Sequence, residues 1–462
     1  MYKDLILELN GIDLGDKRLN VRSGILIERM AADTAASINA SCQGWNETNA
    51  AYKFFDNKKV EPQKILRAHR EATEKRICEE EVVLIVQDTT ELDYSKHPTK
   101  DSGVLDAEYR YGLYDHSHLA FTPERLCLGV VGVEFFSRTP ESLGKTRERR
   151  NDPIETKESF RWLQGYRLAC ELTASCPTTQ IVSVADCECD IYDIFLETEE
   201  QDTPADFVIR AKQDRRIPEE EPETGPNAYR SVLDEVATSQ LVTTRQIDLP
   251  RTPKREARQA TLEIRATRVR VRPPAHRRDL NEVTYNVVLV EEVGGPNDGT
   301  NVCWLLITTL PIDSGKAVLL IVDYYVARWP IEVFFRVFKT GCRVEDIQLE
   351  TNGRLMNCLM LYKVIAWRIM YVTFLGREYP DMACDEIFAD VEWKPVWKIV
   401  SDEPLPEKAP PLSIFVPMLA ELGGYNNRST DHPPGPQVIW VGIRRMTDFA
   451  IAWTAFGPKD AT

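Results

Sequence analysis

The spacing of apolar residues divides the chain into a helical beginning, an alternating middle and a helical end. Residues 1–76 carry apolar positions at mixed three- and four-residue spacing, which predicts helices. Short apolar runs at 82–88 and 181–186 each end in a carboxylate and predict buried strands. Because these runs alternate with helical segments such as 159–175, the pattern predicts an α/β layer.

A different pattern covers residues 213–300. Segments 261–272 and 284–293 alternate apolar and polar positions, which predicts a half-buried, β-rich insertion. An apolar strand returns at 304, and helical spacing follows from about 313 to 375.

The charge of the chain is unevenly distributed. Lys plus Arg number 57 against 72 Asp plus Glu, and the net charge of −15 argues at first against a nucleic-acid partner. Residues 241–278, however, hold eleven Lys or Arg and three acids, and the arginines of 268–272 share one strand face. A phosphate-binding surface and a solvated sheet edge explain that face equally well. Residues 378–408 carry nine acids and three lysines, which predicts a linker or a partner-binding face.

Metal-binding and targeting motifs are weak. Cys187 with Cys189, and His116 with His118, have no second pair at zinc-finger spacing, so we interpret them as core or surface residues. No secretory signal is visible, and the longest apolar runs fall short of the roughly 18 residues that cross a bilayer. We therefore expect a cytoplasmic protein without a membrane partner.

Two aspartates have the same local context. Asp88 ends the run VVLIVQD and Asp186 ends the run IVSVAD, and the ends of neighbouring central strands meet at one edge of an α/β sheet. Either residue taken singly is also explained as a turn residue or helix cap. Their shared context makes a joint site the better hypothesis.

A third group of polar residues lies in the segment 325–339. Tyr325, Arg328, Glu332 and Lys339 fall within one stripe at helical spacing, although Pro330 indicates a bend and a new helix beginning there. Taken alone, Glu332 and Lys339 would be unrelated solvated charges. With the two aspartates, Glu332 provides the third carboxylate of a two-metal phosphoryl-transfer site, in which Arg and Lys bind the phosphodiester.

These residues carry a resemblance. The spacing Tyr-x2-Arg-x3-Glu-x6-Lys resembles the signature of a large group of bacterial DDE transposases, those of cut-and-paste insertion sequences. The segments QDTT, VADCECDIY, RWPIE, LGDKR, NAAYKFF and the C-terminal LGG also resemble the group, so the similarity covers nearly the whole chain.

The resemblance implies an α/β, ribonuclease-H-like catalytic core with a β-rich insertion, flanked by helical domains. The implied domains are a DNA-binding domain (1–76), a catalytic domain (77–375, with its insertion at 213–300) and a dimerisation segment (376–462). It also implies roles for nine residues. Asp88, Asp186 and Glu332 would be the catalytic, metal-binding triad; Tyr325, Arg328 and Lys339 would contact end phosphates; Trp304 would stack on a flipped base; Arg210 and Lys212 would be further phosphate contacts.

The implied activity is metal-dependent excision of a mobile element and its transfer into target DNA. Two Mg²⁺ ions, or Mn²⁺ as a substitute, would serve nicking, hairpin formation, hairpin opening and strand transfer. The partners would be double-stranded DNA and, in the synaptic complex, a second copy of the chain, acting in the cytoplasm on nucleoid DNA. A catalytically silent DNA-binding relative or inhibitor, and a structure-specific nuclease on the same fold, are the alternatives.

Overall fold

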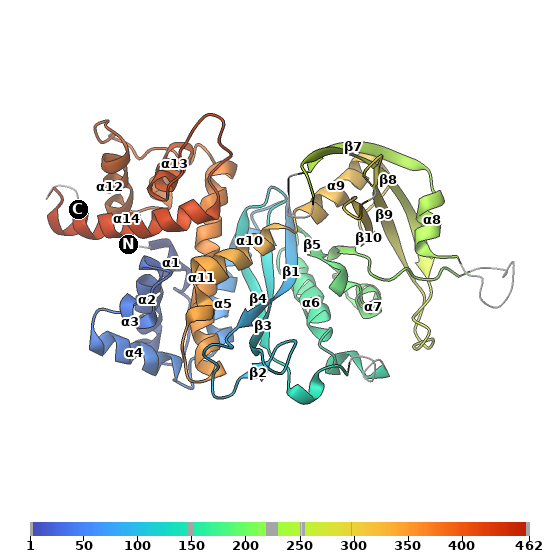
Figure 1. Cartoon of the computed structure of the whole chain (residues 1–462), viewed down its shortest axis with the longest axis horizontal. Helices are drawn as coiled ribbons and strands as arrows, with labels where there is room; N and C mark the ends of the chain where they lie inside the picture. The colour runs from blue at the N-terminus through green and yellow to red at the C-terminus, as the bar shows by residue number, and fades with distance from the viewer. Residues whose placement is uncertain are drawn as a thin grey trace. The chain divides into compact units, whose positions relative to one another are not determined.

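The computed structural model describes residues 3–145, 151–218, 230–249, 251, 255–296 and 298–458, drawn in Figure 1. The chain forms two compact units. The first unit consists of Met1–Glu79, Thr89–Gly144 and Trp329–Thr462, and the second consists of Glu80–Asp88 and Lys145–Arg328. Strand β1 (Val82–Asp93) contributes its residues up to Asp88 to the second unit and the rest to the first.

The first unit begins with the helices that the apolar spacing predicts. They are α1 (Lys3–Glu8), α2 (Lys17–Ala32), α3 (Ile38–Ser41), α4 (Trp45–Phe55) and α5 (Pro62–Ile77). Side-chain caps fix two of the starts, because Asp16 accepts from the Arg18 amide and Ser37 from the Ala40 amide. Pro62 opens α5, where a missing N–H costs nothing.

The first unit also contains a β-ribbon packed against two long helices. The ribbon consists of β2 (Gly103–Val104), β3 (Tyr111–Phe121) and β4 (Cys127–Phe136), paired antiparallel in the order β2-β3-β4. Helices α5 and α11 (Asn352–Glu378) both contact β4. A buried network connects these elements: His69 on α5 accepts from the Val130 amide on β4, and Glu8 lies 2.6 Å from both His69 Nδ1 and Arg76 Nη1.

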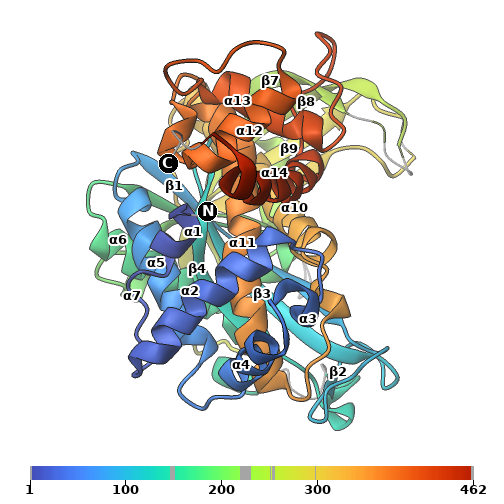
Figure 2. The ribbon, with the colours of Figure 1, turned by 90° about the vertical axis from the view of Figure 1, so that its left-hand side faces the viewer.

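The C-terminal part of the first unit is helical, as Figure 2 shows. Three helices follow α11, namely α12 (Asp390–Val400), α13 (Leu412–Leu422) and α14 (Pro436–Phe456). The acidic stretch 378–408, for which a linker was one expectation, therefore contains a packed helix, with Trp393 and Val396 of α12 buried. Helices α13 and α14 approach closely at Gly442, where a Cβ would lie 2.0 Å from the Leu419 carbonyl oxygen.

Helix α11 is long and apolar enough to cross a membrane by length and composition alone. The apolar runs considered in the sequence did not reveal this stretch. Its most apolar window is 89% buried inside the molecule, which is the property of a core helix.

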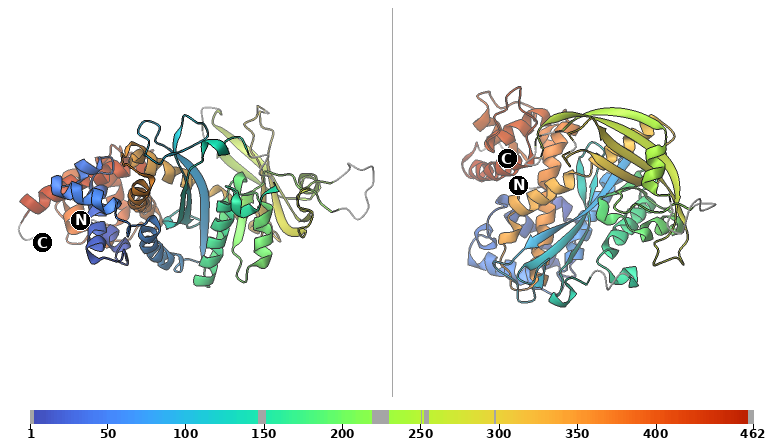
Figure 3. Two further views of the ribbon diagram at one scale, coloured as in Figure 1. Left: turned by 90° about the horizontal axis from the view of Figure 1, so that it is seen from below. Right: turned by 45° about the vertical axis from the view of Figure 1, so that its right-hand side comes forward.

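The second unit is built on a mixed sheet with the strand order β1-β5-β6-β10-β9-β8-β7 (Figure 3). Strands β1, β5 and β6 are parallel. The remaining neighbours, β6 with β10, β10 with β9, β9 with β8 and β8 with β7, are antiparallel. The bounds are β5 (Gln180–Ala185), β6 (Asp206–Arg210), β7 (Leu241–Leu249), β8 (Arg258–Val271), β9 (Val283–Val293) and β10 (Cys303–Thr308). Its helices are α6 (Phe160–Ser175), α7 (Tyr192–Glu200), α8 (Val232–Thr238) and α9 (Gly315–Val326).

Strands β7, β8 and β9 form the β-rich part that the alternating pattern predicts between 213 and 300. Residues 219–229, inside the expected insertion, lie outside the described residues. On β8 the side chains of Val269 and Val271 are buried while Arg268 and Arg270 are exposed. The predicted alternation is therefore present.

Candidate functional site

The two aspartates come together through the register of parallel strands. Val86 of β1 is paired with Val184 of β5. Continuing that register by two residues places Asp88 opposite Asp186, on the same face of the sheet. Neighbouring strands lie about 4.8 Å apart, so this register sets the two residues at the ends of adjacent strands.

The same row continues onto the next strand. Ala185 of β5 is paired with Ile209 of β6, so the next residues, Asp186 and Arg210, are also neighbours on one face. By this register, Asp88, Asp186 and Arg210 form one row of residues at the ends of three neighbouring strands.

Trp304 and Lys212 occupy the adjacent row of that face. Arg210 is paired antiparallel with Leu306, and the Ala211 amide donates to the Leu305 carbonyl at 2.7 Å. The same register sets Lys212 opposite Trp304. The side chain of Lys212 is exposed and that of Trp304 is half-buried.

Hydrogen bonds fix both carboxylates. Arg328, directly after α9, donates from Nη1 to Asp88 Oδ2 at 2.7 Å, and these side chains are only 13% and 18% exposed. Asp186 is the N-cap of a short 3₁₀ turn, η4 (Cys187–Cys189), and accepts from the Glu188 amide at 2.8 Å. The cap interpretation and the site interpretation of Asp186 are therefore compatible.

Tyr325 on α9 lies beside this row. Its ring centroid is 5.3 Å from that of Trp304, with the rings at 63°. Burial raises the pKa of the Tyr325 hydroxyl, and the positive charges of Arg210 and Arg328 oppose that shift. The Tyr325 phenol is therefore close enough to Arg210 and Arg328 to be influenced by their charges. Contacts thus connect Tyr325 to Trp304 and to the arginines, and Arg328 to Asp88, all within the second unit.

Asp190 is a residue that the sequence analysis missed. Its Oδ2 accepts from the amides of Lys212 and Gln213, both at 2.7 Å, and its carboxylate pairs with Arg215. It therefore holds the chain beyond β6 next to the turn that follows Asp186. The available signal was the repeated acid in DCECD, four residues after Asp186.

Glu332 and Lys339 belong to the first unit. Pro330 is the first residue of α10 (Pro330–Arg336), which confirms the predicted new helix. The single α-helical stripe up to Lys339 is wrong, because Val337–Gly341 forms a π-helical turn, which contains more residues per turn and displaces Lys339 around the axis. Lys339 Nζ donates to the Glu91 carbonyl at 2.7 Å and lies 3.2 Å from Glu345 Oε1. Glu332 is half-buried in the first turn of α10.

A bound metal ion needs several ligand atoms that converge on one point. Within the residues that the structure describes, no group of three His, Cys, Asp or Glu side chains is close enough to hold a metal. Asp88 and Asp186 belong to one unit and Glu332 to the other. The two neighbouring carboxylates of the second unit fit a hard cation such as Mg²⁺, which prefers oxygen ligands.

The histidine and cysteine motifs occupy core or turn positions. His116 and His118 are buried on β3, where their rings lie 4.7 Å apart. Cys189 is buried and Cys187 is half-buried.

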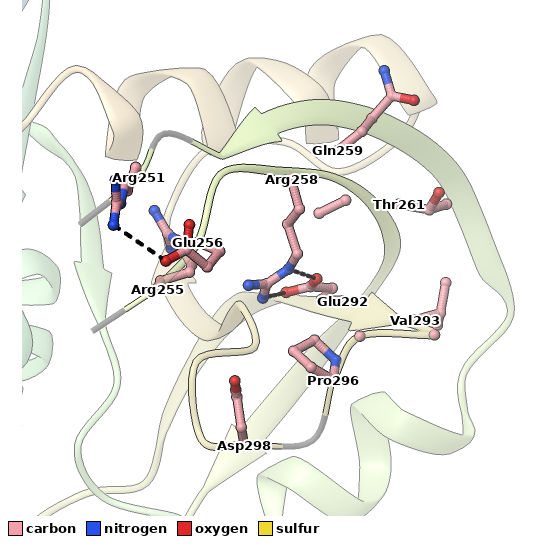
Figure 4. Close-up of a pocket in the computed structure, with 13 residues that line it drawn as sticks. Arg251, Arg255, Glu256, Arg258, Gln259, Thr261, Glu292, Val293, Pro296 and Asp298 are labelled. Carbon is pink, nitrogen blue, oxygen red and sulfur yellow. Dashed lines mark hydrogen bonds and ion pairs between the residues drawn. The ribbon is translucent and has the colours of Figure 1, made fainter. Parts of the chain in front are cut away.

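Many arginines of the basic segment 241–278 form ion pairs with acids of the same unit. Arg245, Arg258, Arg270 and Arg277 form ion pairs with Asp323, Glu292, Glu282 and Asp193, which all lie outside residues 241–278. A pocket of about 1170 Å³ lies in this region. Among its lining residues, Arg258 binds Glu292 with two hydrogen bonds and Arg251 pairs with Glu256 (Figure 4). The number of basic residues in 241–278 therefore overstates the positive charge that is available to bind phosphate. This favours the interpretation of these arginines as a solvated sheet edge.

Comparison with known proteins gives matches at both ends of the chain. Residues 5–60 match the family described as Transposase DNA-binding, and residues 364–455 match the Transposase Tn5 dimerisation domain. These matches support a Tn5-type DNA transposase. They also support DNA binding and dimerisation for the chain.

One solved structure similar to this chain is the piggyBac transposase synaptic complex with hairpin DNA. The identity is 9% and the TM-score 0.35, with 78% of this chain and 66% of that chain covered. Because this likeness is distant, no conclusion rests on it.

Proposed function

We propose that this protein is a DDE transposase that excises a mobile element and inserts it into target DNA. The observation that carries the proposal is the row formed by Asp88, Asp186 and Arg210 on one face of the sheet. A ribonuclease-H-like core with metal ligands at the ends of neighbouring parallel strands would present such a row. The resemblance contributes Glu332 as the third carboxylate.

The chain's own residues would hold and orient the DNA. Asp88, Asp186 and Glu332 would be the ligands of two Mg²⁺ ions, with Mn²⁺ as a substitute. When bound, the ions would supply an activated attacking oxygen and a stabilised leaving oxygen. Arg328, Lys339, Tyr325, Arg210 and Lys212 would bind end phosphates, because cations and a phenol donate hydrogen bonds to phosphate oxygens.

Trp304 would bind an unstacked base. Its indole is half-buried and its edge contact with Tyr325 fixes the ring, so that an exposed part of the ring remains for stacking. A flipped base would allow the strand to bend into a hairpin. The full proposed sequence is nicking, hairpin formation, hairpin opening and strand transfer by a homodimer acting on DNA in the cytoplasm.

An assay on a linear duplex that carries the element's end sequence, with Mg²⁺, tests the proposal. Hairpinned and joined products support a transposase. Cleavage without joining would indicate a structure-specific nuclease, and a mobility shift without cleavage would indicate a silent DNA-binding relative. Either of the last two results would overturn the proposed function.

A further inference from the structure

A fully buried ion pair lies in the core of the first unit. Lys363, in the middle of α11, and Asp115, on β3, are both 0% exposed. The Lys363 ammonium donates to Asp115 and, at 2.9 Å, to Ser117 Oγ, while the Ser117 hydroxyl donates to Asp115 Oδ1 at 2.7 Å. Two of the three ammonium donors are thereby directed toward β3.

The other side of the ammonium faces a set of aromatic rings. Lys363 Nζ lies 4.1 Å from the ring centroid of Phe338, 5.1 Å from that of Phe334 and 5.4 Å from that of Phe335. These rings belong to α10 and to the π turn that continues it. The cation therefore contacts the buried stripe of the same helical segment that carries Glu332 and Lys339.

Burying this pair is costly for the fold. Two charges removed from water lose several kcal/mol of hydration each, and apolar residues of the same volume often stabilise a core equally well. A desolvated cation, however, is attracted to ring faces, which carry negative charge, and not to ring edges. If the neighbouring side chains were aliphatic, α10 could pack in several rotations about its axis. The contact between the Lys363 ammonium and the rings favours the rotation that directs the three ring faces at Nζ.

We propose that Lys363 is a positioning residue that fixes the rotation of α10 and its π turn, and thereby the direction of Glu332 and Lys339. This inference rests on the proposed function of those two residues. Asp115 and Ser117 anchor the ammonium, and Phe334, Phe335 and Phe338 transmit its position to the helix. Lys363 itself contacts neither metal nor DNA in this role.

The test compares a single and a double variant of the buried pair with a matched control. Lys363→Met keeps the length of the side chain but leaves Asp115 buried without its counter-charge, so the double variant K363M/D115N removes both charges together. Arg368→Met is the matched control, because Arg368 is also buried on α11 and its guanidinium contacts the Phe388 ring. Single-turnover cleavage of the end duplex, the dissociation constant for that duplex and amide hydrogen exchange over 330–341 are measured.

A positioning role predicts that K363M/D115N recovers the thermal stability lost in Lys363→Met but not the cleavage rate. The rate is expected to fall about 100-fold, since a displacement of about 1 Å costs that much, while end binding changes less than about threefold. Exchange over 330–341 is expected to rise at least tenfold. Phe338→Leu should give the same loss, and the two losses should not add.

Two outcomes would overturn the inference. One is wild-type cleavage by K363M/D115N, and the other is unchanged exchange over 330–341. If the wild-type protein does not cleave the duplex, the proposed function fails, and the exchange measurement alone then decides whether Lys363 holds the helix. Arg368→Met should leave cleavage and exchange over 330–341 at wild-type values.

Discussion

The candidate site residues are fixed by different physics in the two units. In the second unit, Asp88, Asp186 and Arg210 are aligned by backbone pairing, and one register determines all three. In the first unit, Glu332 and Lys339 are carried by α10 and a π turn whose rotation is set by side-chain packing around Lys363. Strand register is discrete, because a slip by one residue reverses every side chain. Helix rotation is continuous and needs a specific contact to define it.

The largest expected effect is the loss of cleavage when one of the proposed metal ligands is removed. Glu332→Ala and Asp186→Ala should each lower end cleavage at least about 1,000-fold, and the double variant should be no worse, because such groups act as a unit. End binding by mobility shift should persist in all three.

Asp346→Asn provides the control for the carboxylate variants. Asp346 is exposed and pairs with Arg343, so its removal should leave cleavage unchanged. Retained cleavage in Glu332→Ala would contradict the proposed role of Glu332 as a metal ligand.

Trp304 tests whether the second unit binds an unstacked base. Trp304→Ala should lower hairpin formation by about 10- to 100-fold, since base stacking is worth about 1–3 kcal/mol. Trp304→Phe, which retains an aromatic face, should recover most of that loss. The two rates are measured with a pre-nicked end duplex. Equal hairpin formation by Trp304→Ala and wild type would contradict stacking and leave Trp304 as a core residue packed on Tyr325.

Acid should loosen the first unit before the second. Burial lowers the pKa of His118 on β3 to about 4, compared with an ordinary value of 6.5. Between pH 6.5 and pH 4 the His118 imidazole is therefore protonated in the unfolded chain but not in the folded chain. The free energy of unfolding falls as the pH drops through this range. At pH 4 the cost from this residue is about 3 kcal/mol.

Urea unfolding between pH 7 and pH 4, with hydrogen exchange resolved by segment, measures the acid effect. Amides of β3 and β4 should lose protection at a higher pH than those of β5 and β6. His118→Phe should flatten the pH dependence in the first unit and leave that of the second unit unchanged. An identical pH profile in wild type and His118→Phe would contradict the assignment of the acid effect to His118.

The smallest effect is expected for the arginines of the insertion. Arg270 is 68% exposed and pairs with Glu282, so Arg270→Ala should change the unfolding free energy by less than about 0.5 kcal/mol. Its effect on end binding should also remain below about threefold, in contrast to Arg210→Ala. A salt titration of binding provides the measurement. A salt slope reduced by about one in Arg270→Ala would identify a phosphate contact at that position.

The sequence predicts the placement of the candidate residues better in the second unit than in the first. Two apolar runs ending in Asp were enough to expect both carboxylates at one sheet edge, because buried parallel strands read as short apolar segments. The segment 325–339 was only partly predictable. Pro330 correctly indicated the new helix, but no local signal marks the π turn at Val337–Gly341. The charge of the insertion was overestimated because the acids that pair with its arginines are distant in the sequence.

The sequence by itself determined the strands and helices and predicted which of their residues would carry the chemistry, since apolar periodicity and the Tyr-Arg-Glu-Lys spacing are local properties. Only the tertiary structure decided how Arg328 contacts Asp88, how Asp190 holds the chain beyond β6, and how Lys363 lies beneath the rings of α10. Each of these contacts joins residues brought together by strand pairing or helix packing. Their energy depends on burial and on the partner's orientation, and neither is encoded in residue spacing.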